Sequence, residues 1–456
     1  MKYDIDQIKA IKSMDNTLVI AGAGSGKTTT IIGKIDYIIK NNLYEEEEIL
    51  IISFTNETVK ELKSKIKYQI DVKTFHKLAK DIISKINKDL SIANDYELKY
   101  IINEYFNSYG KYNKKTNLII KRIMQSANQK QIQNLIFSFI NIYKCNYEDI
   151  YYLYNLYKKS IFINKYYFKI ILDIYLIYSS ELESSGKMDF NELIINATKY
   201  IKENKVKLNY KYIIIDEFQD ISLIRFKLIN SILNQNKAHI FAVGDDFQSI
   251  YKFSGCDISL FINIKTLLPD INIIKLNHNY RNNQSLINIA NRFIMKNKKQ
   301  IIKNTICHKD DLKPIKIVFY VDKKTVVNNI LKNIKGNILI LGRNNKDKEI
   351  FNIIENKYIK FLTIHSSKGM EEDNVILINL ENSTLGLPLK TKKESILNKI
   401  FKCDYIIHEE ERRLFYVALT RSRNNVYLIT PYDNYSVFIK EIIKDNYKNL
   451  DFIHIK

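Results

Sequence analysis

The amino-acid sequence predicts an α/β protein in which two parallel sheets follow one another along the chain, with a helical insertion in the first. Two features predict this class. Short apolar runs rich in β-branched residues end in polar or glycine-containing residues, and stretches of helical periodicity separate them, as in sheets whose parallel strands are joined by helices. Residues 80–205 are poor in glycine, lack proline and place Ile, Tyr, Asn and Lys at helical spacing, which indicates helices.

The candidate strands form an early and a late set. The early set comprises residues 18–21, 49–54, 212–215 and 239–243. The late set comprises residues 271–276, 315–320, 337–342, 361–364, 374–379 and 425–430. We place a first sheet domain at residues 1–80 and 206–276, the helical insertion at 81–205 and a second sheet domain at 277–456. Parallel sheets carry their chemistry at the carboxyl ends of the strands, so the residues that follow these runs are the candidate site.

The chain is strongly basic. Its 456 residues are too many for one compact core, and 71 Lys and Arg against 50 Asp and Glu give a net charge of +21. A polyanion such as nucleic acid would account for this excess, and so would a lysine-rich surface in a chain generally rich in Ile, Lys, Asn and Tyr. Charge alone therefore does not identify a partner.

The cysteines and the apolar runs bear on where the protein works. Cys145, Cys256, Cys307 and Cys403 lie far apart and include no C-x-x-C pair, which argues against a zinc site or a disulfide framework and favours a reducing compartment. The first ten residues lack the apolar core of a signal peptide, and no apolar run approaches the roughly 20 residues that span a bilayer. We expect a soluble, cytoplasmic protein without a membrane partner.

A glycine-rich turn follows the first candidate strand. Gly22, Gly24 and Gly26 would let backbone N–H groups surround a phosphate, and the helix that begins next adds its positive end. Lys27 would reach the terminal phosphates and Thr28 would bind Mg²⁺ through its hydroxyl. The alternative is a glycine turn without a ligand. The sequence predicts a site for ATP and Mg²⁺ built from Ala21, Gly22, Ala23, Gly24, Ser25, Gly26, Lys27, Thr28 and Thr29, although the strict pattern has glycine at position 21.

Acidic residues follow the run at 212–215. Asp216 can bind Mg²⁺ through water, and Glu217 can orient and deprotonate an attacking water molecule. The alternative is that Asp216 or Asp220 caps a helix. Because a metal bound to a nucleoside triphosphate would meet these acids beside the phosphate loop, the two segments together predict nucleotide hydrolysis.

With these two sites in place, the segment VGDDFQSIYKFSGCD at residues 243–257 resembles the UvrD/Rep type of superfamily 1 helicase, and most closely the helicase IV branch. Further matching motifs follow in the family's order from Gln7 to Thr430. The resemblance implies two tandem RecA-like domains and an ATP-dependent motor on single-stranded DNA. It also implies movement in the 3′→5′ direction and unwinding of duplex DNA.

The resemblance assigns further residues to the nucleotide. It implies that Gln7 reads the adenine edge, that Tyr280 lies against the adenine and that Glu371 lies near the ribose. Gln248 would sense the γ-phosphate, and Arg281 and Arg421 would contact it from the second domain. The predicted catalytic set is therefore Lys27, Asp216, Glu217, Gln248, Arg281 and Arg421.

The resemblance also assigns residues to single-stranded DNA. These are Phe54, Thr55, Asn56, His76, Tyr251, Phe253 and His365. Stacking of a base on an aromatic ring contributes about 1–3 kcal/mol and tolerates any base, which suits a motor on arbitrary sequences. The alternative for each aromatic or histidine side chain is ordinary packing.

Some positions depart from the family pattern. Phe253 and Ser254 stand where relatives often have tryptophan and arginine, and Thr29 stands where many have arginine. Only residues 344–360 occupy the place of a large inserted domain. Two alternatives therefore stay open: a translocase that remodels protein–DNA complexes without unwinding, and a nucleotide-gated DNA clamp. We expect a monomer on single-stranded DNA and its junctions with duplex, with possible protein loading partners, and RNA is less favoured.

Overall fold

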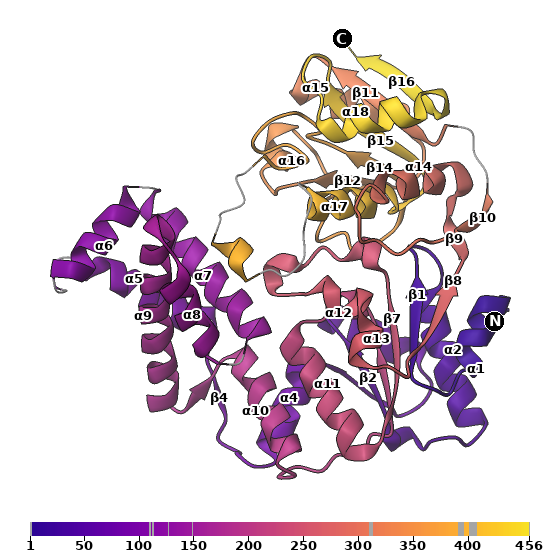
Figure 1. The fold of residues 1–456 in the computed structure, drawn as a ribbon. Coiled ribbons are helices and arrows are strands. Elements are labelled where there is room, and N and C mark those ends of the chain that lie inside the picture. Colours follow the sequence, from indigo (N-terminus) through magenta and orange to yellow (C-terminus); the bar gives the residue numbers. More distant parts are fainter. Residues whose placement is uncertain are drawn as a thin grey trace.

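The computed structural model describes residues 2–108, 111, 114–125, 127–147, 149–309, 313–390, 396–400 and 408–455. Two sheet units lie one above the other, and a group of helices extends to one side of the lower unit (Figure 1). Each unit contains a six-stranded sheet in which every strand pairing is parallel. This arrangement confirms the predicted fold class.

The first sheet has the strand order β3-β2-β6-β7-β1-β8. Its strands are β1 (Thr17–Ala21), β2 (Ile49–Ser53), β3 (Asp71–Thr74), β6 (Tyr212–Ile215), β7 (His239–Gly244) and β8 (Asn272–Leu276). One face is covered by α1 (Ile5–Lys12), α2 (Lys27–Lys40) and α3 (Asn56–Lys65), and the other by α4 (Phe75–Ser84), α10 (Phe190–Lys202) and α11 (Leu223–Asn236). Strands buried on both faces read as continuous apolar runs, and this is why β1, β2 and β6 were legible in the sequence.

Two strand assignments in the first sheet differ from the prediction, and the second sheet adds an unpredicted strand at Leu450–Ile455. The run at 271–276 was placed in the late set, but β8 pairs with β1 and belongs to the first sheet. Strand β3 was not predicted. It pairs only with β2, at the edge of the sheet, and Asp71 and Lys73 alternate with its apolar residues, so no apolar run marks it.

The second sheet has the order β13-β12-β14-β15-β11-β16. Its strands are β11 (Ile315–Tyr320), β12 (Ile338–Gly342), β13 (Ile359–Thr363), β14 (Glu372–Leu377), β15 (Ser422–Pro431) and β16 (Leu450–Ile455). Helices α14 (Gln284–Ile294), α17 (Glu409–Leu419) and α18 (Val437–Asn446) cover one face, and α15 (Lys323–Leu331) packs on the other. A ribbon of β9 (His278–Asn283) and β10 (Ile306–Lys309) lies where the chain passes between the units (Figure 1).

The helical arm has an apolar core of its own. It consists of α5 (Asp95–Asn107), α6 (Lys114–Met124), α7 (Gln129–Asn146), α8 (Tyr151–Lys159) and α9 (Phe162–Ser184), with the short pair β4 (Ser91–Ile92) and β5 (Lys187–Met188) at its base. Helix α10 lies within the predicted segment 81–205 but packs on the first sheet. Ile396 and Ile400, from the second unit, are buried in the core of the arm.

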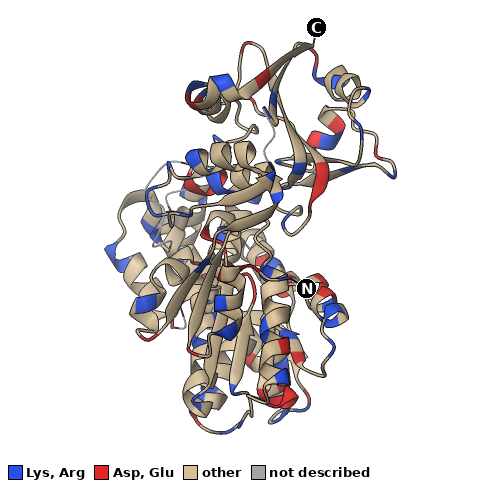
Figure 2. Ribbon diagram, turned by 90° about the vertical axis from the view of Figure 1, so that its right-hand side faces the viewer, with Lys and Arg blue, Asp and Glu red and all other residues tan. Residues whose placement is uncertain are grey.

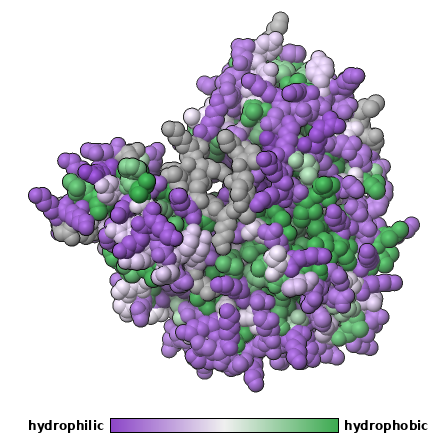
Figure 3. Space-filling view, viewed as in Figure 1, coloured by the Kyte–Doolittle hydropathy of each residue, from purple (hydrophilic) through white to green (hydrophobic). Residues whose placement is uncertain are grey.

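The surface is mixed in charge and largely hydrophilic. Figure 2 shows basic residues spread over both sheet units and interleaved with acidic ones. In Figure 3 hydrophilic side chains cover most of the visible face, and apolar ones gather over the first unit. None of the described helices is both long and apolar enough to cross a membrane. Cys145, Cys256 and Cys307 form no disulfide among the described residues, and Cys403 lies outside them.

Candidate active site

The turn between β1 and α2 has the geometry of a phosphate loop. Gly24 and Gly26 have φ angles of 70° and 78°, a backbone region that residues with a Cβ rarely adopt. Helix α2 begins at Lys27, so its first N–H groups face the loop and have no partner within the helix. The side chain of Gln7 is buried and donates to the carbonyl of Ser25 over 3.4 Å. The structure therefore places Gln7 against the loop.

Glu217 lies directly opposite Lys27. The ammonium of Lys27 is 3.1 Å from Oε1 of Glu217, and that of Lys368 is 3.6 Å from Oε2. The Glu217 backbone has a φ of 52°, which is uncommon for a residue other than glycine. Gln219 donates a further hydrogen bond to the same carboxylate. The ammonium groups of Lys27 and Lys368 and the amide of Gln219 thus hold the Glu217 carboxylate, which the sequence predicted as the base.

Burial and charge separate the two carboxyl groups at the end of β6. Burial would raise the pKa of Glu217, but Lys27 and Lys368 outweigh burial and hold this pKa well below its usual range. Burial, and then the charge of Glu217, raise the pKa of Asp216 to about 7. Within the described part of the chain Asp216 forms no ion pair. A cation that binds near Asp216 would favour the charged form of this carboxyl group and lower its pKa.

The residues present fit Mg²⁺. Asp216 and Thr28 supply the hard oxygen donors that Mg²⁺ prefers, and Mg²⁺ usually retains several water molecules in addition to one or two carboxylates. No group of three or more His, Cys, Asp or Glu residues suited to a metal occurs in the described ranges. Phosphate and water oxygens would therefore complete the coordination, as expected for an ion that arrives with a nucleotide.

Gln248 connects the first unit to the second. It ends the short helical turn Asp246–Gln248 that follows β7, and its side chain is buried. Its Nε2 donates to Asp245 over 2.5 Å, and its Oε1 accepts from Nη2 of Arg421 over 2.9 Å. Its backbone carbonyl accepts from Lys368 over 2.9 Å. A continuous series of contacts therefore runs from the phosphate loop to the second unit through Lys27, Glu217, Lys368, Gln248 and Arg421.

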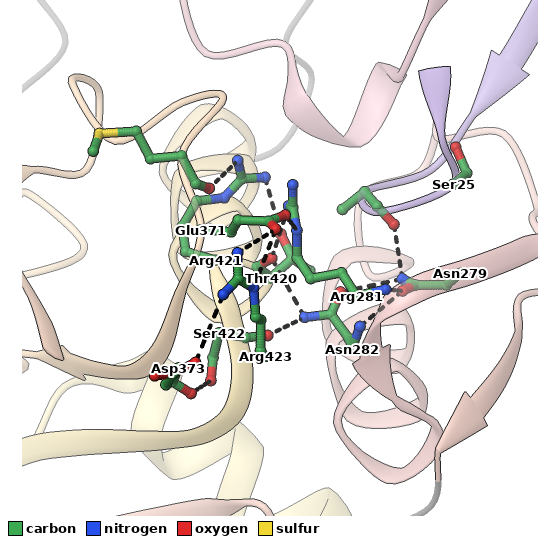
Figure 4. A network of polar contacts seen from close by, with 12 residues as sticks. Ser25, Asn279, Arg281, Asn282, Glu371, Asp373, Thr420, Arg421, Ser422 and Arg423 are labelled. Atoms are coloured by element: carbon green, nitrogen blue, oxygen red, sulfur yellow. Dashed lines mark hydrogen bonds and ion pairs between the residues drawn. The ribbon is translucent and has the colours of Figure 1, made fainter. Parts of the chain in front are cut away.

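Both predicted arginines lie at the seam between the units (Figure 4). Arg421 follows α17, is only 1 % exposed and donates to the carbonyls of Val417 and Met370 over 3.0 and 3.1 Å. Burial, and then the nearby charge of Arg281, lower the pKa of Arg421 to about 9. Arg281 lies beside the phosphate loop, because a Cβ added to Gly24 would come within 2.7 Å of the Cβ of Arg281.

Tyr280 and Glu371 flank these arginines. The backbone N–H of Tyr280 donates to the carbonyl of Gly24 over 2.9 Å, and its 47 % exposed ring has His308 stacked at 5.5 Å. Tyr280 also donates to Asp4, which caps α1 just before Gln7. Glu371 forms ion pairs with Arg281 and Arg423 (Figure 4). The structure therefore brings Gln7 and Tyr280 to the same end of the loop.

The predicted DNA residues form two separate groups. In the first group, Phe253 is 58 % exposed and its ring lies 5.4 Å from that of His365, while Tyr251 donates to the His365 carbonyl over 3.2 Å. Phe253 and His365 line a cavity of about 490 Å³ together with Arg343 and Asn344. The sequence interpretation missed these last two residues. Their position directly after the predicted strand 337–342 could have identified them.

The second group lies on the first unit. Phe54 packs edge-on against Phe75 at 5.3 Å, and the ring of His76 lies 5.0 Å from that of Phe190. Arg225, which no motif indicated, lies 5.4 Å over the ring of Phe54. Burial, and then the charge of Arg225, lower the pKa of His76 to about 4.

Thr55 caps α3, which begins at Asn56, and both residues follow Phe54. Both side chains are exposed, and the Thr55 hydroxyl caps the helix by accepting from the N–H of Thr58 over 3.2 Å. Packing and capping thus account for part of the second group, and its contact with DNA stays a prediction.

Two family models match this chain. The UvrD/REP helicase N-terminal domain matches residues 4–269, and the UvrD-like helicase C-terminal domain matches residues 341–432. The first match covers the phosphate loop, Glu217 and Gln248, and the second covers Glu371 and Arg421.

Individual relatives agree with the family models. DNA helicase IV of Escherichia coli strain K12 is 27 % identical over 96 % of this chain and 69 % of its own length. A probable DNA helicase of Mycoplasma pneumoniae is 24 % identical over 94 % of this chain and 84 % of its own length. The ATP-dependent DNA helicase Rep of Buchnera aphidicola subsp. Baizongia pistaciae is 30 % identical over 65 % of this chain, and the match spans only 43 % of that protein.

Proposed function

Because this chain belongs to the UvrD/Rep family of helicases, we propose that it is an ATP-dependent DNA helicase that couples ATP hydrolysis to movement along single-stranded DNA. The observation that carries the proposal is the series of contacts from Lys27 through Glu217, Lys368 and Gln248 to Arg421. It joins a phosphate loop in one unit to an arginine in the other, so a change at the phosphates reaches the second sheet directly.

Several members of the series, together with Arg281, take distinct roles in hydrolysis. Lys27 binds the terminal phosphates, and Glu217 accepts a proton from the attacking water. Arg421 and Arg281 stabilise the negative charge that develops on the γ-phosphoryl group. Thr28 and Asp216 would hold Mg²⁺, which would neutralise phosphate charge when bound. Gln248, on the first unit, accepts a hydrogen bond from Arg421 and so holds the guanidinium at the seam.

The contact between Lys27 and Glu217 also suggests how nucleotide binding could activate Glu217 as a base. Lys27 is the first of the cations that hold the pKa of Glu217 below its usual range. When Lys27 turns toward a phosphate, Glu217 loses part of this stabilisation and its pKa rises. A carboxylate with a higher pKa is a better proton acceptor at neutral pH. A triphosphate that engages Lys27 would therefore make Glu217 a better base, while Lys368 continues to favour the charged carboxylate.

The nucleic-acid groups lie on both units, as a motor requires. Phe253 of the first unit and His365 of the second are in contact beside the 490 Å³ cavity. A strand bound there would feel any movement of one unit against the other. We propose the 3′→5′ direction and a preference for single strands and their junctions with duplex from the family alone. The intracellular location, the monomeric state and the loading partners stay predictions.

A steady-state ATPase assay on the purified chain, with and without single-stranded DNA, tests the proposed function. We expect single-stranded DNA to stimulate turnover, because the nucleic-acid groups and the nucleotide site share the seam. Turnover that DNA leaves unchanged would contradict a motor and favour a nucleotide-gated clamp. An unwinding assay on a tailed duplex then separates a helicase from a translocase. Faster release of streptavidin from the 3′ than from the 5′ end of DNA would overturn the proposed direction.

Replacing Phe253 by alanine is expected to weaken single-stranded DNA binding by about 5- to 150-fold, since one base–aromatic stack contributes about 1–3 kcal/mol. The ring is exposed, so the fold should be unaffected. Fluorescence anisotropy with labelled single strands at one fixed salt concentration measures the change. Tyr447→Ala, an exposed aromatic residue near the C-terminal strand, is the matched control. Equal affinity of the Phe253→Ala variant and the wild type would contradict a contact between Phe253 and DNA.

A further inference from the structure

Lys303 is a buried cation outside every segment that the sequence analysis identified. It lies between α14 and β10, and its side chain is only 7 % exposed. Its ammonium forms ion pairs with both Asp245 and Asp246, at 2.5 Å from Oδ1 of Asp246, and lies 3.6 Å from the ring centre of Phe247. Both aspartate side chains are fully buried. The three residues thus form a closed ionic cluster under the turn that ends in Gln248.

The segment that carries Lys303 approaches from the side of the second unit. It follows α14, which packs in the core of the second sheet, whereas Asp245 and Asp246 follow β7 of the first sheet. Gln300 and the backbone N–H of Ile301 also donate to Asp246, over 2.7 and 2.8 Å. Residues 300–303 therefore hold the Asp245–Asp246 turn from across the seam.

The cluster and Arg421 together determine which way the side-chain amide of Gln248 points. Asp245 accepts from Nε2 of Gln248, which leaves the amide oxygen of Gln248 facing Nη2 of Arg421. An ionised carboxylate only accepts hydrogen bonds, so this order cannot reverse while Asp245 stays charged. A fully buried carboxylate without a cation is costly, and Lys303 supplies the cation.

Lys303 also affects how strongly Asp245 attracts the guanidinium of Arg421. Asp245 lies close enough to favour the charged form of Arg421. If Lys303 did not neutralise Asp245, this carboxylate would attract the guanidinium of Arg421 more strongly and compete with a phosphate for it. Lys303 therefore affects two of the three groups predicted to act at the γ-phosphate, namely Gln248 and Arg421.

We propose that Lys303 is a positioning residue for ATP hydrolysis, which acts through Asp245 to orient Gln248 and to leave Arg421 available to the phosphate. The inference rests on the proposed function, in which Gln248 and Arg421 contact the γ-phosphate. Lys303 touches neither the phosphate loop nor the predicted base among the contacts that the described residues make.

Kinetics of the full-length Lys303→Met variant test the inference. We expect kcat of the DNA-stimulated ATPase to fall about 10- to 100-fold, the range usual when a residue that orients a ligand group is mutated. KM for ATP should stay within about threefold of the wild type. Lys296→Met is the matched control, because Lys296 also follows α14 but pairs with Glu441 and Asp445 at the surface. Its kcat should stay within about twofold of the wild type. Lys303→Arg, which keeps the charge, should recover most of the loss.

A double-mutant cycle separates positioning from general stability. In a Gln248→Ala background, Lys303→Met should lower kcat by a smaller factor than in the wild type, because only its effect on Arg421 remains, whereas independent effects would multiply. If Lys303→Met does not fold, the double variant Asp245→Asn/Lys303→Gln replaces the ion pair by a neutral pair of similar shape. It should fold and also lose kcat, because a neutral asparagine amide accepts a hydrogen bond more weakly than a carboxylate and can present either end to Gln248.

The outcomes are distinguishable. A folded Lys303→Met or Asp245→Asn/Lys303→Gln variant with wild-type kcat overturns the inference and leaves the proposed function intact. Losses that multiply with Gln248→Ala show a structural role only and also overturn it. A wild-type chain without DNA-stimulated ATPase activity overturns the proposed function, and the inference fails with it.

Discussion

Replacing Glu217 by glutamine is expected to lower DNA-stimulated ATP turnover about 10²- to 10⁴-fold, the contribution usual for a general base. Glutamine has nearly the same shape but cannot accept the proton from water. Lys27 would lose its 3.1 Å ion pair and would be freer to bind phosphate. Nucleotide affinity should therefore stay equal or rise while kcat falls. Titration with a fluorescent ATP analogue and steady-state kinetics measure the two quantities separately.

The matched control for this variant is Glu203→Gln. Glu203 follows α10 in the same unit and pairs with Lys205 at the surface, 2.7 Å away. The two variants share the chemical change and differ only in place. Wild-type turnover in Glu217→Gln would show that Glu217 is not the base. The proposed role of the series of contacts at the seam in hydrolysis would then lose its support.

Much of the fold was legible in the sequence because parallel strands buried on both faces cannot avoid continuous apolar runs. The runs at 18–21, 49–54 and 212–215 correspond to β1, β2 and β6. The run at 271–276 was equally legible as a strand, but its partner was not, because pairing of β8 with β1 depends on contacts more than 250 residues apart in the chain. The family assignment is confirmed by the two family models.

Strand positions alone place some of the predicted site residues near one another, whereas the residues that meet across the seam came only from the family resemblance or were missed. Lys27 and Glu217 follow predicted strands, and a parallel sheet brings such residues to one edge. Lys303 gave no comparable signal, since it lies in a segment without apolar periodicity and meets Asp245 only when the second unit packs on the first. Likewise, periodicity marks α10 as a helix but does not say that it packs on the first sheet.

Replacing Arg421 by alanine is expected to lower DNA-stimulated kcat about 10³- to 10⁵-fold, the effect usual for an arginine that stabilises the charge of a transferred phosphoryl group. Arg421 is already placed for this role, because Gln248 and two backbone carbonyls hold its guanidinium, whereas Arg281 is paired with Glu371. The contribution arises mainly in the transition state, so KM for ATP should change far less than kcat. Steady-state kinetics at saturating DNA measure both.

Arg421→Lys distinguishes geometry from charge at the same position. A lysine keeps the positive charge, but its single ammonium cannot reproduce the planar fork that contacts Val417, Met370 and Gln248 together. We therefore expect this variant to lose most of the activity that Arg421→Ala loses, with less loss of thermal stability, because one buried donor remains. Arg292→Ala, which removes a surface arginine that contacts the carbonyl of Asp445 over 2.7 Å, is the control and should retain wild-type turnover. Full activity in Arg421→Lys would mean that charge alone suffices, and full activity in Arg421→Ala would remove Arg421 from the stabilisation of the γ-phosphoryl group.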